Sequence, residues 1–169
     1  MAADTALSPT QPQGRRVLAQ ARFEAAILGR NGEQLLVSLV LPALAMVALV
    51  ASSYPALPEP RVAVVVPGVL ALAVVSTAFT GQAIQTGFDR RYGVLRFLAT
   101  TPVGTDGLLA GKAVAVAGVA AVQLLVLGTL GLALGWRPDP LGLLTAPVTA
   151  VLGVWVFVAL ALLLAGLMR

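Results

Sequence analysis

Four long apolar runs, separated by short polar segments, dominate the chain. Each run approaches or exceeds the roughly 20 residues that an α-helix needs to cross a bilayer. The runs cover approximately residues 34–52, 62–87, 108–134 and 141–168. This pattern predicts an all-α, polytopic membrane protein with four transmembrane helices. Residues 14–169 would form its transmembrane domain and residues 1–13 a disordered cytoplasmic tail.

The composition strengthens the membrane prediction. Of the 169 residues, 59% are hydrophobic and 11% are charged. A soluble domain of this length could not bury so much apolar surface. Arginine far outnumbers lysine, and Ala, Gly, Val, Leu and Pro dominate, which is typical of a GC-rich bacterial genome. We therefore expect a multi-pass protein of the bacterial inner membrane.

The distribution of basic residues predicts the orientation, because cytoplasmic segments carry the excess of Lys and Arg. With the N-terminus inside, nine basic residues lie on the cytoplasmic side and two lie outside. The nine are Arg15, Arg16, Arg22, Arg30, Arg90, Arg91, Arg96, Lys112 and Arg169, and the two are Arg61 and Arg137. Both termini are therefore expected in the cytoplasm.

Residues 15–30 have the periodicity of an amphipathic helix. Val17, Leu18 and Ala21 share one face, whereas Arg15 and Arg22 lie on the other. Such a helix suits a membrane surface that contains anionic lipids. A solvated helix packed on the cytoplasmic side of the protein is the alternative.

Polar residues gather in the last third of the second run. Six Ser, Thr and Gln side chains are too many for a face that meets lipid, so they should face other helices or a water-filled path. For Gln123, near the middle of the third run, a helix–helix hydrogen bond is favoured over a substrate contact. The candidate residues of a translocation path are Thr80, Gln82, Gln85 and Gln123.

Other positions carry expectations about packing. Gly107 and Gly111, and then Gly131 and Gly135, have the four-residue spacing that permits close helix contact. Lys112, near the start of the third run, should extend its stem towards the interface. Pro42, inside the first run, should kink its helix or mark a thin spot.

The sequence argues against an enzyme. It has no cysteine and no histidine, and none of its seven acidic residues lies in the middle of a run. No catalytic or metal-binding residues are therefore expected. Residues 107–113, GLLAGKA, differ from a phosphate-binding P-loop, because three residues instead of four separate the glycines and Ala113 follows the lysine. An ion-coupled carrier is disfavoured because it would need an acid at mid-depth.

Residues 88–102, FDRRYGVLRFLATTP, are unusually charged for a connection between two membrane helices. On one continuous helix, Phe88, Tyr92 and Leu95 would share an apolar side with Leu98. Thr101-Pro102 would end this helix, and Asp106 would cap the next one. Such a helix suits a partner's groove. The alternative is a basic loop that only sets topology.

The order acidic–Arg–x–x–Gly–x–Leu–x–x–Leu–x–x–Thr–Pro resembles the first cytoplasmic loop of type-2 ATP-binding-cassette (ABC) exporter permeases. The matching residues are Asp89, Arg90, Gly93, Leu95, Leu98, Thr101 and Pro102. In that family the loop holds a coupling helix that contacts a separate cytoplasmic ATPase, which binds ATP and Mg. The resemblance therefore implies a membrane subunit of an exporter with no cofactor of its own. The coupling residues that it implies are Asp89, Arg90, Arg91, Tyr92, Gly93, Leu95, Arg96 and Leu98.

Permeases of that family usually have six spans, whereas four are predicted here. The resemblance thus implies that a second permease copy or a complementary fragment completes the path, with membrane lipid around it and no nucleic acid. By analogy, the substrate would be an amphipathic drug, lipid or glycan. A small structural or assembly membrane protein, or a truncated fragment without transport activity, is the alternative.

Overall fold

The computed structural model describes residues 13–30, 32–93 and 104–167, and these are helical apart from two loops and short turns. The helices are α1 (Gln13–Arg30), α2 (Gly32–Ala51), α3 (Val62–Val75), the π-helix η1 (Ser76–Gly81), α4 (Gln82–Arg91), α6 (Gly104–Ala133) and α7 (Pro140–Leu167). No strand occurs in these ranges, so the all-α prediction is confirmed. Residues 1–12, most of the predicted N-terminal tail, lie outside the described residues.

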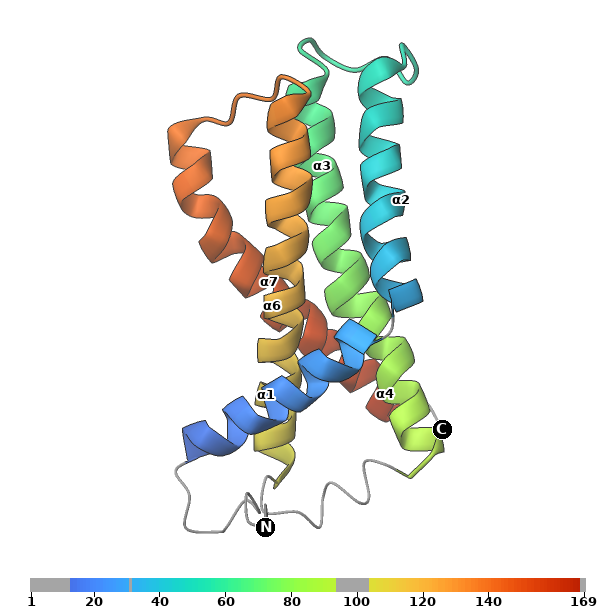
Figure 1. Cartoon of the computed structure of the whole chain (residues 1–169), viewed down its shortest axis with the longest axis vertical. Coiled ribbons are helices and arrows are strands. Elements are labelled where there is room, and N and C mark those ends of the chain that lie inside the picture. Colours follow the sequence, from blue (N-terminus) through green and yellow to red (C-terminus); the bar gives the residue numbers. More distant parts are fainter. Residues whose placement is uncertain (1–12, 31, 94–103, 168–169) are drawn as a thin grey trace, which may run out of the picture.

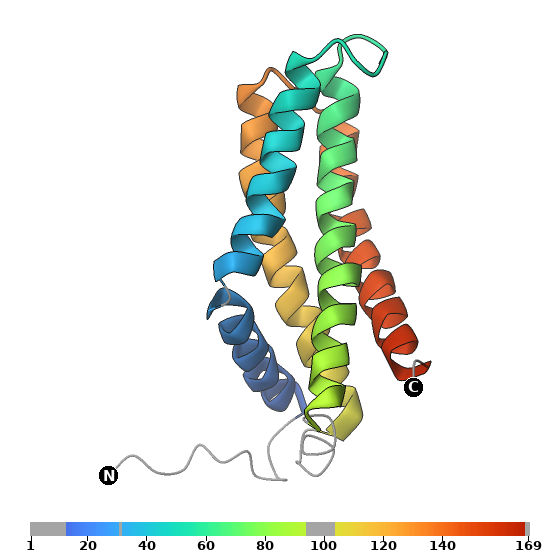
Figure 2. The ribbon, with the colours of Figure 1, turned by 90° about the vertical axis from the view of Figure 1, so that its right-hand side faces the viewer.

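The helices form a bundle with one helix across its end. Figure 1 shows α2, α3 and α6 upright beside one another, with α7 inclined behind them and α1 crossing the foot of α6. The helix α3 continues through η1 into α4 without a break, as the second view shows (Figure 2). This composite helix runs through Arg91 instead of ending near residue 87.

Three helical stretches in the described part of the chain are long and apolar enough to span a membrane. They are Val62–Arg91, Ala110–Ala133 and Pro140–Leu167. The apolar part of α2, Leu36–Ala51, is shorter. Three of the four predicted spans thus have clear counterparts, and the first span stays a prediction. Although Pro42 lies inside α2, the helix continues through it.

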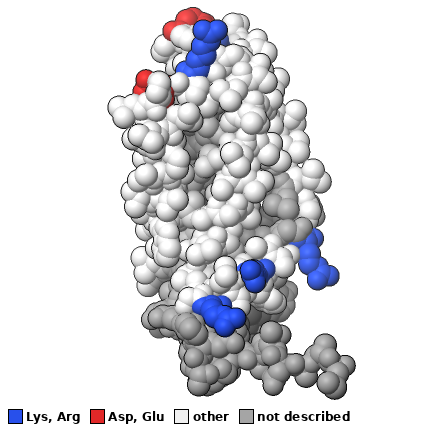
Figure 3. Space-filling model, turned by 60° about the vertical axis from the view of Figure 1, so that its left-hand side comes forward, with Lys and Arg blue, Asp and Glu red and all other residues white. Residues whose placement is uncertain are grey.

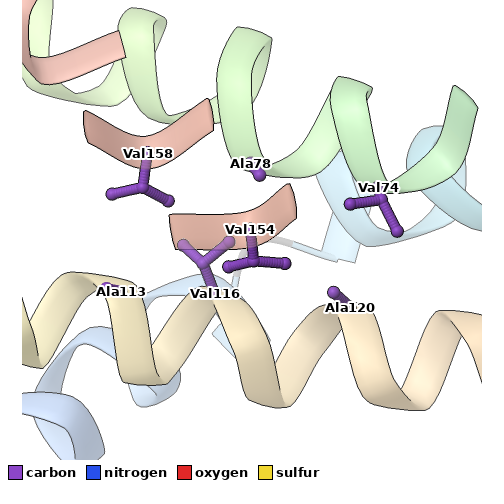
Figure 4. Packing of buried hydrophobic residues seen from close by; sticks show 7 residues of the cluster. All are labelled: Val74, Ala78, Ala113, Val116, Ala120, Val154 and Val158. Carbon is purple, nitrogen blue, oxygen red and sulfur yellow. The ribbon is translucent and has the colours of Figure 1, made fainter. Parts of the chain in front are cut away.

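Two clusters of buried apolar residues hold the bundle together. One joins α3 and η1 to α6 and α7, where small residues such as Ala78, Ala113 and Ala120 let valines from the facing helices approach (Figure 4). The other joins α2, α3 and α6 around Met46, which is fully buried. Because the outer faces of these helices expose many leucines and valines, the core is narrow and the surface is apolar.

Two glycines mark close contacts between helices, as the sequence predicts. A Cβ on Gly111 would lie 2.5 Å from Cγ of Gln20 in α1, and a Cβ on Gly131 would lie 2.6 Å from Cγ1 of Val66 in α3. These distances are shorter than side chains allow, so α1 and α3 can pack on α6 at these points only against glycine.

Gly135 has a different role from the predicted helix contact. Its φ of 92° is left-handed, and it ends α6 in a turn where the Trp136 N–H donates to the carbonyl of Gly131 at 2.9 Å. The Gly135 N–H also donates to Leu132, which completes a Schellman motif. The contact prediction for Gly135 is therefore wrong. The side-chain surroundings at Gly107 lie outside the described part of the structure.

Candidate functional site

A hydrogen-bonded polar cluster lies in the interior of the bundle, centred on Gln123 of α6. The hydroxyl of Thr77, in η1, donates to Oε1 of Gln123 at 2.8 Å. Nε2 of Gln123 donates to Oγ of Ser38 in α2 at 2.9 Å and to the Ser38 carbonyl at 3.3 Å. Gln123 is 3% exposed. The favoured helix–helix hydrogen bond is therefore present, and it joins three helices.

The π-helix provides one side of this cluster. Its six residues, Ser76–Gly81, have a wider turn than an α-helix, and π segments are frequent at functional sites. Thr77 faces Gln123, whereas Thr80 is exposed on the outside of the same segment. Thr80 and Gln123 are therefore not brought together by the fold.

A second polar group follows in α4. Nε2 of Gln82 donates to Oε1 of Gln85 at 3.3 Å. Gln82 and Thr86 are one helical turn apart, so they share a face, and they are 2% and 4% exposed. Gln82 Oε1 and Thr86 Oγ1 are buried without a hydrogen-bond partner among the described residues. Buried polar atoms of this kind normally bind water or another polar group.

An ion pair lies further along the same composite helix. Nζ of Lys112, in α6, is 2.9 Å from Oδ2 of Asp89, in α4. The Lys112 side chain is 2% exposed and that of Asp89 is 21% exposed. The expectation that Lys112 extends to the interface is wrong, because a carboxylate on the neighbouring helix holds the ammonium group inside the bundle.

The end of α4 is fixed to α7 as well. Nη1 of Arg90 donates to the carbonyl of Ala165 at 2.7 Å and to that of Gly166 at 3.2 Å. These carbonyls belong to the last turn of α7, where a cation is favoured by the helix dipole. Asp89 and Arg90, adjacent in sequence, thus connect α4 to two different helices.

The predicted helix from Phe88 to the Thr101-Pro102 stop is not continuous, and its part after Gly93 lies outside the described residues. The helix ends at Arg91, and Gly93 has a left-handed φ of 72°. A residue in this conformation ends a helix, and glycine adopts it without steric cost. The rings of Phe88 and Tyr92 stack at 6.3 Å and are 52% and 72% exposed.

Part of the proposed coupling segment lies outside the described residues. These positions are Leu95, Arg96, Leu98, Thr101 and Pro102. The side chain of Asp106 also lies outside, but its backbone is the third residue of α6. It therefore lies within the first helical turn and is not the capping residue that precedes it.

The charges divide the surface into zones. Figure 3 shows an uncharged band between charged side chains at the two ends of this face. Arg15, Arg22 and Arg30 of α1 lie towards the same end as the termination of α4, and Arg61 lies in the loop at the opposite end. An uncharged middle between charged ends is what a bilayer requires.

This membrane-spanning architecture agrees with a comparison of the sequence with protein families. Residues 15–169 match the family model described as ABC-2 type transporter. The chain belongs to the ABC-2 type transporter family. No curated protein and no solved structure shows a significant match.

This family membership confirms the resemblance that residues 88–102 show to ABC-2 permeases. The chain is a multi-pass ABC-2 permease, which is a transport subunit and not an enzyme. The match covers almost the whole chain and gives no support to a structural or assembly role.

The structure also supplies contacts of this ABC-2 permease that the sequence did not identify. Ser38 lies in an apolar run, and nothing in the sequence indicates which residue it bonds to. Thr77 is one of several Ser and Thr residues in the second run, and the sequence does not distinguish it from the others. Their shared contact with Gln123 depends on the packing of three helices. An isolated polar residue inside an apolar run is the signal that could have identified Ser38.

Proposed function

We propose that this ABC-2 permease is the membrane subunit of an exporter driven by a separate cytoplasmic ATPase, which binds ATP and Mg. The observation that carries this proposal is the attachment of the α4 end to two helices. Asp89 pairs with Lys112 of α6, and Arg90 bonds to the end of α7. A force applied to the segment after Gly93 would therefore act on three helices together.

The exposed residues at this end provide the first part of a docking surface. The stacked rings of Phe88 and Tyr92 leave much apolar area in contact with solvent, and Arg91 beside them is exposed. Aromatic residues beside arginine are typical of interface hot spots. Leu95, Arg96 and Leu98 would complete the contact with the ATPase, and Gly93 would set the direction of the chain towards it.

The composite helix supports a mechanical connection from the end of α4 to the interior of the bundle. The α4 segment continues into η1, whose Thr77 belongs to the Gln123 cluster. Movement of α4 would thus reach the middle of the bundle. We place Thr80, Gln82, Gln85 and Gln123 along the translocation path, with a second permease copy or a complementary fragment on its other side. The buried Oε1 of Gln82 supports a polar surface there. An amphipathic drug, lipid or glycan would suit a path of mixed polarity.

We also propose four spans with both termini in the cytoplasm of a bacterium, whose inner membrane holds the protein. α1, the end of α4 and the end of α7 lie at one end of the bundle (Figure 1). That end carries most of the described basic residues, which supports its cytoplasmic placement. α2 would be the first span, and α1 would lie along the membrane surface.

Reconstitution with the cognate ATPase tests the proposal. The permease should bind the ATPase in vesicles, and the rate of ATP hydrolysis should differ between vesicles with and without the permease. An ATPase that neither binds these vesicles nor changes its hydrolysis rate would contradict the proposal. Any further segment that completes the assembly should be co-expressed.

A further inference from the structure

An open groove is lined by residues of α1, α2 and α6. Figure 1 shows α1 crossing the foot of α6 beside the start of α2. The volume of the groove is about 480 Å³, which is within the usual range of small-molecule sites. Its sides come from Ala21 and Ala25 of α1 and from Leu39 of α2. Ser38 and Gln123 of the polar cluster also line it, whereas Gln82, Gln85 and Thr86 do not.

The floor of the groove is an exposed apolar strip along α6. Val114 and Val122 are 43% and 59% exposed, and no atom lies within 4 Å of the position that a Cβ on Gly118 would take. At 1.5 Å per residue, the strip from Val114 to Val122 is roughly 12 Å long. This length is comparable to the hydrocarbon thickness of one leaflet, about 15 Å.

The α1 side of the groove is basic. Arg22 lines it, and none of its described lining residues is acidic. Arg15 and Arg30 are exposed elsewhere on the same helix and do not line the groove. Leu18 and Phe23, which are 49% and 58% exposed, place apolar side chains beside these arginines. A helix of this kind lies at the depth of the lipid headgroups.

We propose that this groove binds an anionic phospholipid, with one acyl chain along Val114, Gly118 and Val122 and the phosphate at Arg22. An apolar strip about one leaflet long, in a groove that Arg22 also lines, is complementary to that ligand in both shape and charge. Arginine is well suited to phosphate, because its planar group can donate two parallel hydrogen bonds. The bound lipid would stabilise α1 on α6 at the Gly111 contact. The proposal requires only a membrane location, so it stands or falls independently of the ATPase partner.

Native mass spectrometry of the purified chain in a neutral detergent tests this proposal. The chain is titrated separately with phosphatidylglycerol and with phosphatidylcholine. Arg22→Gln removes the guanidinium, and Gly118→Leu fills the groove without a clash at its Cβ. Arg15→Gln and Gly128→Leu are matched controls, because neither residue lines the groove and a Cβ on Gly128 also meets open space.

The wild-type chain should bind phosphatidylglycerol more tightly than phosphatidylcholine. Arg22→Gln should weaken phosphatidylglycerol binding by about tenfold, the scale of a charge-assisted hydrogen bond, with little effect on phosphatidylcholine. Gly118→Leu should weaken the binding of both lipids, and the two controls should match the wild type. An excess of inorganic phosphate should not displace the lipid, because it lacks the acyl chain.

Three results would overturn the proposal. One is equal phosphatidylglycerol binding by the wild type, Arg22→Gln and Gly118→Leu. Another is displacement by inorganic phosphate alone, which would make the site a simple anion site. The third is a dimer that Gly118→Leu dissociates while lipid binding is unchanged, because the groove would then be an interface between copies.

Discussion

The ammonium of Lys112 lies 2.9 Å from the carboxylate of Asp89, inside the bundle and at the last turn of α4. The pair is separated by 23 positions in sequence and joins α4 to α6. Asp89 precedes Arg90, which bonds to the end of α7. The helix that leads into residues 94–103 is therefore held from two sides by adjacent residues.

Removal of one partner of this ion pair should destabilise the protein. Asp89→Ala leaves the buried Lys112 without this counter-ion, and the loss should be about 3 kcal/mol, as for other broken buried pairs. The double variant Asp89→Leu, Lys112→Met should recover much of the loss, because no buried charge remains. Thermal unfolding in detergent provides the measurement, with Arg91→Ala as an exposed control. Single variants as stable as the wild type would contradict the burial of the pair.

The close contact at Gly111 predicts a steric effect. Gly111→Leu should displace α1 from α6, because even a Cβ would lie 2.5 Å from Gln20. Gly128→Leu, on the same helix, meets open space and should have little effect. Spin labels on exposed positions of α1 and α7 would report the displacement as a changed distance distribution. If both variants gave the wild-type distribution, α1 would not be packed at Gly111.

The Gln123 cluster should stabilise the bundle modestly. Gln123→Leu removes the hydrogen bonds to Thr77 and Ser38, and the cost should be about 0.5–2 kcal/mol, the range measured between membrane helices. Thr149→Ala is the control, because its hydroxyl bonds only within α7. Unfolding in detergent with a denaturant compares the two variants. A Gln123→Leu variant no less stable than Thr149→Ala would count against a cluster that joins helices.

The orientation can be tested without removing native thiols, because the chain has no cysteine. Single cysteines at Ser53, Asp139 and Arg96 would be exposed to a membrane-impermeant reagent in intact cells. We expect labelling at positions 53 and 139 and none at position 96 until the membrane is made permeable. Labelling at 96 with position 53 silent would invert the topology.

Helices and some of their contacts were predictable from the sequence, but the contacts at the end of α4 were not. Apolar runs predict helices because membrane spans must satisfy their own backbone. Gly111 and Gly131 were predictable because small residues permit close packing. From the sequence, Gly93 cannot be distinguished from a glycine inside a helix. Its left-handed φ in the structure shows that it follows the end of α4. The burial of Lys112 depends on Asp89 of another helix, which no local pattern reveals.

The central claim is that the end of α4 and the residues after it dock on a cytoplasmic ATPase. The most direct measurement is the affinity of the cognate ATPase for the reconstituted permease and for its Tyr92→Ala and Leu95→Ala variants. Tyr54→Ala is the matched control, because Tyr54 is also largely exposed, at 82% against 72% for Tyr92, and lies in a loop at the opposite end of the bundle. We predict that each docking variant binds the ATPase roughly 30-fold more weakly, as expected for loss of an interface hot spot, while Tyr54→Ala binds like the wild type. Unchanged affinity in both docking variants, with the protein correctly inserted, would contradict the claim and leave residues 88–102 as a loop that sets topology.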